Sequence, residues 1–170
     1  LEPTFDNKAP IAIWSQDQHM LVDSLPLCDF AFPQLIRPMD GPDEWRTVDD
    51  MTGDLDVDLR LLSAVTGMSF TRQGLVRIAQ RAAALERALL ARGGRHRRME
   101  ETMLAPHFEL PCRADGTRID AAGLAQLMDE YYATRGWDLE TGWPATELLH
   151  QLGLDEVAAE LEALRHRRFY

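Results

Sequence analysis

Residues 71–94, TRQGLVRIAQRAAALERALLARGG, carry the strongest periodic signal in the chain. Apolar side chains recur in it at spacings of three and four residues, the period of one face of an α-helix: Leu75, Ile78, Ala82, Leu85 and Leu89. Thr71 precedes the run and can cap its first amides, and Gly93-Gly94 closes it. We therefore predict a helix that packs this stripe into a core, and we assign the stripe no chemistry.

The rest of the chain carries similar helical signals and no β-alternation of useful length, so the predicted fold class is all-α. Further helices are expected at about residues 14–25, 43–51, 54–66, 98–104, 121–135, 144–151 and 155–167.

Two segments are expected to be largely irregular, and the second contains at most the one short helix at about residues 98–104. Residues 1–10 are expected to be an extended linker or lead-in, because Pro3 and Pro10 disfavour helix in the residue before each of them. Residues 95–119 alternate charge and proline, which predicts a long surface excursion. Residues 11–170 then form one irregular multihelical bundle.

Charge restricts the partners of this protein. The chain has 18 Lys+Arg against 28 Asp+Glu and a net charge of -10 at pH 7. Such a field repels phosphate backbones and anionic membrane surfaces, so we expect no nucleic acid and no membrane as a partner. No apolar run approaches the roughly 20 residues of a membrane span, and the N-terminus lacks the layout of a secretory signal. We expect a cytoplasmic protein.

Cysteine and histidine usage points to no self-contained metal site. The two cysteines, Cys28 and Cys112, fit a reducing compartment, and we expect no disulfide. Cys28 follows the helix break at Pro26, and a lone cysteine of this kind is usually a small buried hydrophobe. The histidines fall in no HExxH arrangement, so a zinc site is not expected: His19, His96, His107, His150 and His166.

Basic side chains gather in residues 92–98, after the end of the helix at 72–92. Cations are favoured there by the exposed carbonyl groups of the last helical turn, which gives a purely structural interpretation. A docking patch for an anion or a small acidic electron carrier is the alternative. Glu100 and Glu101 are neighbours that should point apart on a helix, so paired acid–base work is not predicted. The basic residues are Arg92, Arg95, His96, Arg97 and Arg98.

Three stretches occur in an order that is distinctive when taken together. They are residues 23–30, DSLPLCDF; residues 64–67, AVTG, with 81–87, RAAALER; and residues 129–154, which contain DEYY, RGWD, GWP and LGL. In this order, and over about Asn7 to Leu164, the chain resembles the aldehyde ferredoxin oxidoreductase family. The first stretch is similar to the family's D-x-x-G-L-C element, and the Tyr-Tyr to Arg-Gly-Trp-Asp run is the most distinctive.

The resemblance implies cofactors and site residues. The family uses a tungsten or molybdenum bis-pterin beside a [4Fe-4S] cluster, whose ligands are thiolates. Cys28 would then be one of four cluster ligands, while Asp23 and Leu27 would contact the pterin. Pro26 replaces the family glycine and removes a backbone donor at that position. The other three cluster cysteines, a C-x-x-C-x-x-x-C group in the family, are absent from this chain.

The resemblance also implies a function. The complete enzyme would oxidise an aldehyde to a carboxylic acid and pass electrons through the cluster to ferredoxin. This chain, which begins at Leu1 rather than Met, would be its C-terminal helical part, inactive and without cofactor when separated from an N-terminal cofactor domain of the same polypeptide. Two alternatives stay open: a free-standing helical interaction module of the same ancestry, and a split enzyme whose partner supplies three cysteines.

Overall fold

The computed structural model describes residues 5–25, 57–111 and 114–169. These residues form seven α-helices and one 3₁₀-helix, and their only strand-like pairing is an isolated bridge between Trp137 and Pro144. The all-α prediction is confirmed. The helices are α1 Lys8–Ser24, α2 Val57–Thr66, α3 Arg72–Arg92, α4 Arg97–Leu104, the 3₁₀-helix Ala105–Phe108, α5 Ala121–Arg135, α6 Thr146–Gln151 and α7 Asp155–Phe169. The helix expected at 43–51 lies outside the described residues.

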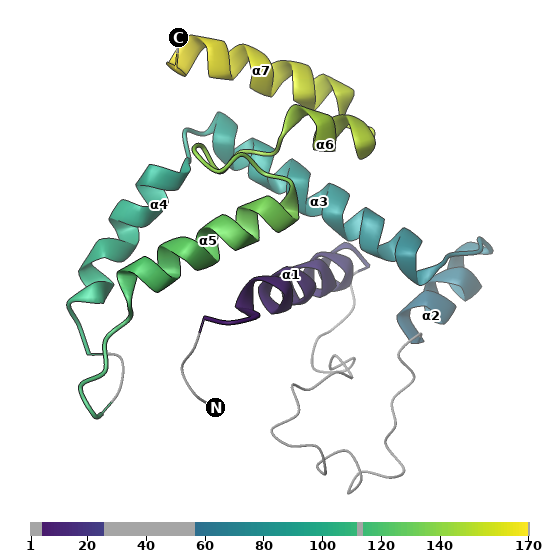
Figure 1. The fold of residues 1–170 in the computed structure, drawn as a ribbon. Helices are drawn as coiled ribbons and strands as arrows, with labels where there is room; N and C mark the ends of the chain where they lie inside the picture. The colour runs from purple at the N-terminus through teal and green to yellow at the C-terminus, as the bar shows by residue number, and fades with distance from the viewer. Residues whose placement is uncertain (1–4, 26–56, 112–113, 170) are drawn as a thin grey trace, which may run out of the picture.

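Helix α3 is the central element (Figure 1). Helices α1 and α5 lie along one side of it, and α6 and α7 lie on the other. As predicted, the Thr71 hydroxyl accepts a hydrogen bond from the Gly74 amide at 3.0 Å and caps the helix. No helix among the described residues is long and apolar enough to cross a membrane.

The buried face of α3 differs from the predicted stripe. Leu75 is fully buried, but Ile78 is 43% exposed and Leu89 is 50% exposed, so this part of the prediction was wrong. The neighbouring helices pack instead against small side chains, which let helix backbones approach closely, and the large aliphatic side chains are left at the flanks. The buried residues of α3 are Leu75, Ala79, Ala83, Ala84, Arg87, Ala88 and Ala91.

Helix α1 begins at Lys8, earlier than the predicted start near Trp14, and takes in the end of the expected linker. Pro10 is the third residue of this helix. Proline is tolerated there because the first amides of a helix have no intrahelical acceptor. Asn7 precedes the helix with a positive φ of 57°.

Two groups of buried side chains hold the helices together. The larger lies between α3, α6 and α7 around the fully buried Trp143 and Leu149. The smaller joins α1 to α3 through Leu21, Leu75 and Ala79. Each group buries apolar surface on an opposite side of α3, which explains its central position.

Arginines of α3 fix the end of α6. Arg77 donates to the carbonyl of Gln151, and Arg81 donates to the carbonyls of Leu152 and Gly153. The last carbonyls of a helix have no intrahelical donor, so these side chains satisfy groups that would otherwise need water. These contacts attach the end of α6 to α3.

The last helices begin close to the predicted residues. Asp120 caps α5 by accepting from the amides of Ala122 and Gly123, and Gly136 ends it in the left-handed conformation, as predicted. Pro144, expected in the first turn of the next helix, precedes α6 instead. It pairs with Trp137 in the isolated bridge, and its carbonyl accepts from Arg165 at 2.8 Å.

The predicted surface excursion contains the expected short helix, α4, followed by the 3₁₀-helix. Neither helix contains a fully buried residue, which fits a surface segment. Two side chains of α4 nevertheless point inward: Arg97 and Glu100 are only 14% and 13% exposed. Helix α4 therefore contributes to the interior.

Candidate functional site

Of the three residues implied by the family resemblance, only Asp23 lies within the described part of the chain. Asp23 is on the last turn of this helix, and its side chain is exposed. Leu25 closes the helix through its amide, which donates to the Leu21 carbonyl at 2.9 Å. Leu27 and Cys28 lie outside the described residues. The structure therefore places one of the three predicted residues, as a carboxylate free to accept hydrogen bonds.

Among residues 5–25, 57–111 and 114–169, no group of three or more His, Cys, Asp or Glu side chains is arranged to hold a metal ion. His96 serves as the cap of α4, with Nδ1 accepting from the Met99 amide at 3.4 Å. The Nδ1 atom of His150 lies 2.5 Å from a carboxylate oxygen of the exposed Asp155.

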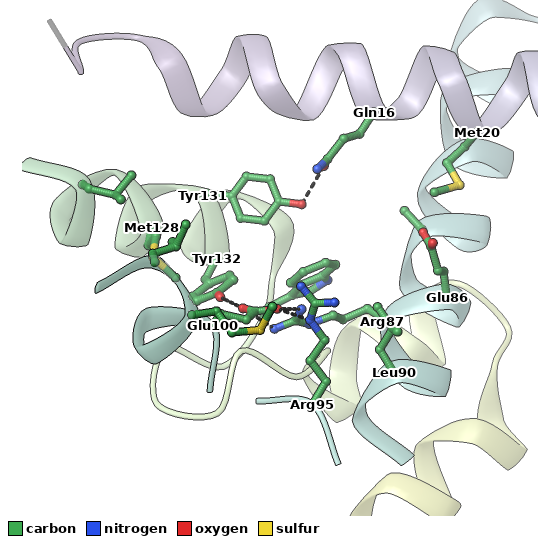
Figure 2. A pocket seen from close by; sticks show the side chains of 15 residues that line it. Gln16, Met20, Glu86, Arg87, Leu90, Arg95, Glu100, Met128, Tyr131 and Tyr132 are labelled. Atoms are coloured by element: carbon green, nitrogen blue, oxygen red, sulfur yellow. Dashed lines mark hydrogen bonds and ion pairs between the residues drawn. The ribbon is translucent and has the colours of Figure 1, made fainter. Parts of the chain in front are cut away.

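A cavity of about 460 Å³ lies between α1, α3, α4 and α5. Its walls combine methionine, leucine and aromatic side chains with four charged residues (Figure 2). Sequence reasoning did not locate this cavity. The lining residues are Gln16, Met20, Ala83, Glu86, Arg87, Leu90, Arg95, Glu100, Met103, Leu104, Leu124, Met128, Tyr131, Tyr132 and Trp137.

One wall of the cavity is a buried hydrogen-bonded network centred on Glu100 (Figure 2). Both terminal nitrogens of Arg87 donate to its carboxylate, at 2.5 and 3.1 Å. The Tyr132 hydroxyl donates at 2.6 Å, and Nε of Arg95 donates at 2.8 Å. Arg87 also donates through Nε to the Gly142 carbonyl at 2.7 Å. The network joins α3, α4, α5 and the turn before α6.

The surroundings of Glu100 shift its acidity. Burial alone raises the pKa of this carboxyl, but hydrogen bonds from Arg87 and Tyr132 outweigh burial and lower the pKa to about 2. Burial and the hydrogen bond to Glu100 together raise the pKa of Tyr132 well above its usual value. Glu100 is therefore held as an anion and Tyr132 as a neutral donor, so neither group is suited to exchange protons near neutral pH.

Aromatic rings pack against this network. The rings of Tyr132 and Trp137 stack with centroids 6.0 Å apart, and the Arg87 guanidinium lies 5.0 Å from the Trp137 ring centroid. Tyr131 meets Trp137 edge-on at 5.6 Å. The aromatic residues of the Tyr-Tyr to Arg-Gly-Trp-Asp run thus pack together at the end of α5, and they also cover two buried charges.

A second buried ion pair joins α1 to α5. Arg135 donates to the Asp17 carboxylate at 2.5 Å, and their side chains are only 4% and 7% exposed. Arg135 also donates to Gln16 Oε1 at 2.8 Å and to the Ile13 carbonyl at 3.3 Å. Gln16 in turn accepts from the Tyr131 hydroxyl at 2.6 Å. The pair positions α1 against the cavity.

Most of the predicted basic cluster is used within the chain. Arg95 binds Glu100, and Arg97 binds Glu101 and Asp129 at 2.7 and 2.5 Å. Arg92 lies 3.5 Å from Glu160. The structural interpretation of the cluster accounts for these contacts, and the docking patch stays a prediction. Glu100 points inward and Glu101 outward, as expected for adjacent helical residues.

Sequence reasoning missed the role of two buried arginines. Arg87 follows Ala84 by three residues and precedes Ala91 by four, so it lies on the alanine face of α3. A charge within a run of small helical residues was the available signal. Arg135 was read only as part of a family motif, and nothing local indicated its partner, Asp17, 118 residues away.

A family model described as aldehyde ferredoxin oxidoreductase, domains 2 & 3, matches residues 2–154. The tungsten-containing aldehyde ferredoxin oxidoreductase of Pyrococcus furiosus is 28% identical over 151 residues, which cover 89% of this chain and 22% of that protein. The same enzyme of Pyrococcus abyssi is 27% identical over the same shares. The chain therefore spans about a fifth of the length of these relatives.

A solved structure has a similar fold over most of this chain. It is described as the active site complex BamBC of benzoyl coenzyme A reductase in complex with 1,5 dienoyl-CoA. The TM-score is 0.65 at 25% sequence identity, over 94% of this chain and 21% of the other. Since the family model covers residues 2–154, the chain belongs to the aldehyde ferredoxin oxidoreductase family, in the part that comprises domains 2 and 3.

Proposed function

We propose that this chain is the C-terminal helical part of a cytoplasmic oxidoreductase that oxidises aldehydes to carboxylic acids and transfers the electrons to ferredoxin. The observation that carries the proposal is the family match over residues 2–154, which includes the DSLPLC element at 23–28. Relatives that match this chain are tungsten-containing enzymes. A tungsten or molybdenum bis-pterin and a [4Fe-4S] cluster are the corresponding cofactors.

Residues of this chain fit part of the cofactor environment. The exposed carboxylate of Asp23 can accept hydrogen bonds from the ring N–H and amino groups of a pterin, and Leu27 would contact it through backbone atoms. The Cys28 thiolate would be one of four cluster ligands. When bound, the metal–pterin and the cluster supply the two-electron oxidation and the single-electron transfers. The protein supplies position and charge.

No group of this chain forms or breaks a bond in the proposed reaction. An aldehyde and water give a carboxylic acid, two protons and two electrons, and the electrons reduce two one-electron carriers of the ferredoxin class. The chain contains two cysteines, whereas a cubane cluster needs four ligands. The isolated chain is therefore expected to be inactive, and the remainder of the polypeptide supplies the other three thiolates.

The apolar surface of α2 and α3 supports contact with further protein. Val65 is 78% exposed, Met68 is 60% exposed and Ile78 is 43% exposed. Exposed apolar side chains are removed from water when another protein covers them, which favours association. The remaining polypeptide of the proposed enzyme is the partner that we assign to this surface.

The proposal is tested on the native polypeptide purified without oxygen. We expect aldehyde-dependent reduction of a viologen dye and of ferredoxin, with iron and tungsten or molybdenum present. Cys28→Ser should lower iron content and activity together, whereas the matched control Cys112→Ser should change neither. Asp23→Asn should lower the pterin content while iron is retained.

Two results would overturn this proposal. One is equal iron content in Cys28→Ser and the unaltered protein, which removes Cys28 from the cluster. The other is a native chain without metal, which favours the second candidate, a helical interaction module that uses the exposed apolar side chains of α2 and α3 to bind another protein.

A further inference from the structure

The lining residues of the cavity between α1, α3, α4 and α5 include none of Asp23, Ser24 and Leu25, which are the described residues of the DSLPLC element. Its volume of about 460 Å³ falls within the range of small-molecule sites, roughly 300–1,000 Å³. Such sites combine mainly apolar walls with a few polar groups that orient the ligand. This cavity has both components.

The apolar component comes mainly from methionine and leucine side chains of three helices. Met20 of α1, Met103 and Leu104 of α4, and Leu124 and Met128 of α5 all face the cavity. Methionine has three rotatable bonds and a polarizable sulfur, and it adapts to apolar ligands of varied shape. These walls are suited to a flexible hydrocarbon chain.

The polar component carries an excess of positive charge at one end. The single carboxylate of Glu100 accepts from both Arg87 and Arg95, so two cations share one anion. All three guanidinium nitrogens of Arg87 donate hydrogen bonds, two to Glu100 and one to the Gly142 carbonyl. Arg95 uses only Nε, and within the described part of the chain its two terminal nitrogens have no hydrogen-bond partner.

The two terminal nitrogens of Arg95 favour a ligand that carries a carboxylate. Its side chain is 42% exposed, and its terminal nitrogens present the planar fork that matches a carboxylate. Glu86 also lines the cavity and lies beside Met20, away from Arg95 (Figure 2). A second negative group on the ligand would be repelled by Glu86, so a monoanion is favoured over a dianion.

We propose that this cavity binds a medium-chain monocarboxylic acid, with the carboxylate on the terminal nitrogens of Arg95 and the hydrocarbon chain against the methionine and leucine walls. Carboxylic acids are also the product class of the proposed reaction, but binding in this cavity requires neither the cofactors nor that reaction. Failure of the proposed redox function therefore leaves this inference intact.

Calorimetric titration of the native protein at pH 7 tests the site, with octanoate and 1-octanol as probes. The two molecules share a chain length and differ in charge. We expect octanoate to bind at one site and octanol to bind at least about tenfold more weakly, because a charge-assisted hydrogen bond pair is lost. Arg95→Gln should weaken octanoate binding about tenfold and leave octanol binding unchanged.

Arg98→Gln is the matched control, because Arg98 belongs to the same basic segment but does not line the cavity. It should leave octanoate binding unchanged. Met128→Gln should weaken both probes. The proposal is overturned if octanoate does not bind, if octanol binds as tightly as octanoate, or if Arg98→Gln has the same effect as Arg95→Gln. The comparison of the two probes needs no variant, so a misfolded variant does not remove the test.

Discussion

Two buried ion pairs with similar exposure are built in different ways. Glu100 and Arg87 are 13% and 8% exposed, and Asp17 and Arg135 are 7% and 4% exposed. Glu100 accepts four hydrogen bonds from Arg87, Arg95 and Tyr132. In the other pair, Nε of Arg135 is buried without a hydrogen-bond partner among the described residues. The exposed fractions alone therefore do not show which pair contributes more to the stability of the fold.

The difference lies in what remains when the carboxylate is removed. Without Glu100, Arg95 and the Tyr132 phenol lose this acceptor, and Arg87 keeps only the Gly142 carbonyl. Without Asp17, Arg135 still donates to Gln16 and to the Ile13 carbonyl. An unpaired buried charge is costly, so the shared carboxylate should matter more than the single one.

Removal of each carboxylate gives the largest expected effect. Glu100→Ala should lower the free energy of unfolding by about 3–5 kcal/mol, because Arg87 is left buried without its anion. Asp17→Ala should cost about 2 kcal/mol, since Arg135 keeps two acceptors. Urea denaturation followed by circular dichroism measures both values. Equal losses for the two variants would contradict the ranking.

The second largest effect is expected from acid, which should weaken the Glu100 network. The pKa of Glu100 is lowered from 4.5 to about 2, which corresponds to about 3 kcal/mol. Because the folded protein holds the carboxyl ionised, this stabilisation is present above pH 4.5 and is lost as the pH falls towards 2. Unfolding free energies measured from pH 6 to pH 2 should fall less steeply for Glu100→Gln. Parallel curves for the variant and the unaltered protein would argue against the network.

An added side chain in the turn that supports Arg87 should lower the free energy of unfolding. Gly142 has a φ of 69°, and a Cβ there would lie 2.6 Å from a terminal nitrogen of Arg87. Gly142→Ala should cost about 2 kcal/mol, from backbone strain and displacement of the guanidinium. Gly116 also has a positive φ but open space around it, so Gly116→Ala should cost only about 1 kcal/mol. Thermal unfolding of both variants separates strain from contact.

Arg95 should contribute least to stability. Its side chain is 42% exposed, and Glu100 retains Arg87 and Tyr132 when it is removed. Arg95→Gln should therefore change the unfolding free energy by about 0.5 kcal/mol, as for a half-exposed ion pair. A loss as large as that of Glu100→Ala would show that the network depends on every donor equally.

Much of the fold follows from local sequence signals. Thr71 and Asp120 cap helices where predicted, and Gly136 ends α5 in the left-handed turn. These features depend on neighbouring residues alone, which is why the sequence predicts them. The buried face of α3 was not predicted correctly, because it depends on which neighbours approach the helix. Alanine permits that approach without adding much apolar area to a periodic pattern.

The candidate sites also differ in whether the sequence alone predicts them. Asp23 came from a motif shared with a family, and the structure shows its carboxylate exposed at the end of α1. The cavity network joins Arg87, Glu100 and Tyr132 from three helices, and its geometry exists only after they pack. Neither periodicity nor charge counting reveals such a long-range contact. Pairs of residues far apart in the chain need the fold itself.

We propose that this chain provides part of a metal–pterin, iron–sulfur enzyme. The most direct test is the mass of the native polypeptide, measured together with its iron and its tungsten or molybdenum content. We predict a polypeptide several times larger than 19.3 kDa that contains both iron and one of the two heavier metals. A native chain of about 19.3 kDa without these metals would contradict the claim.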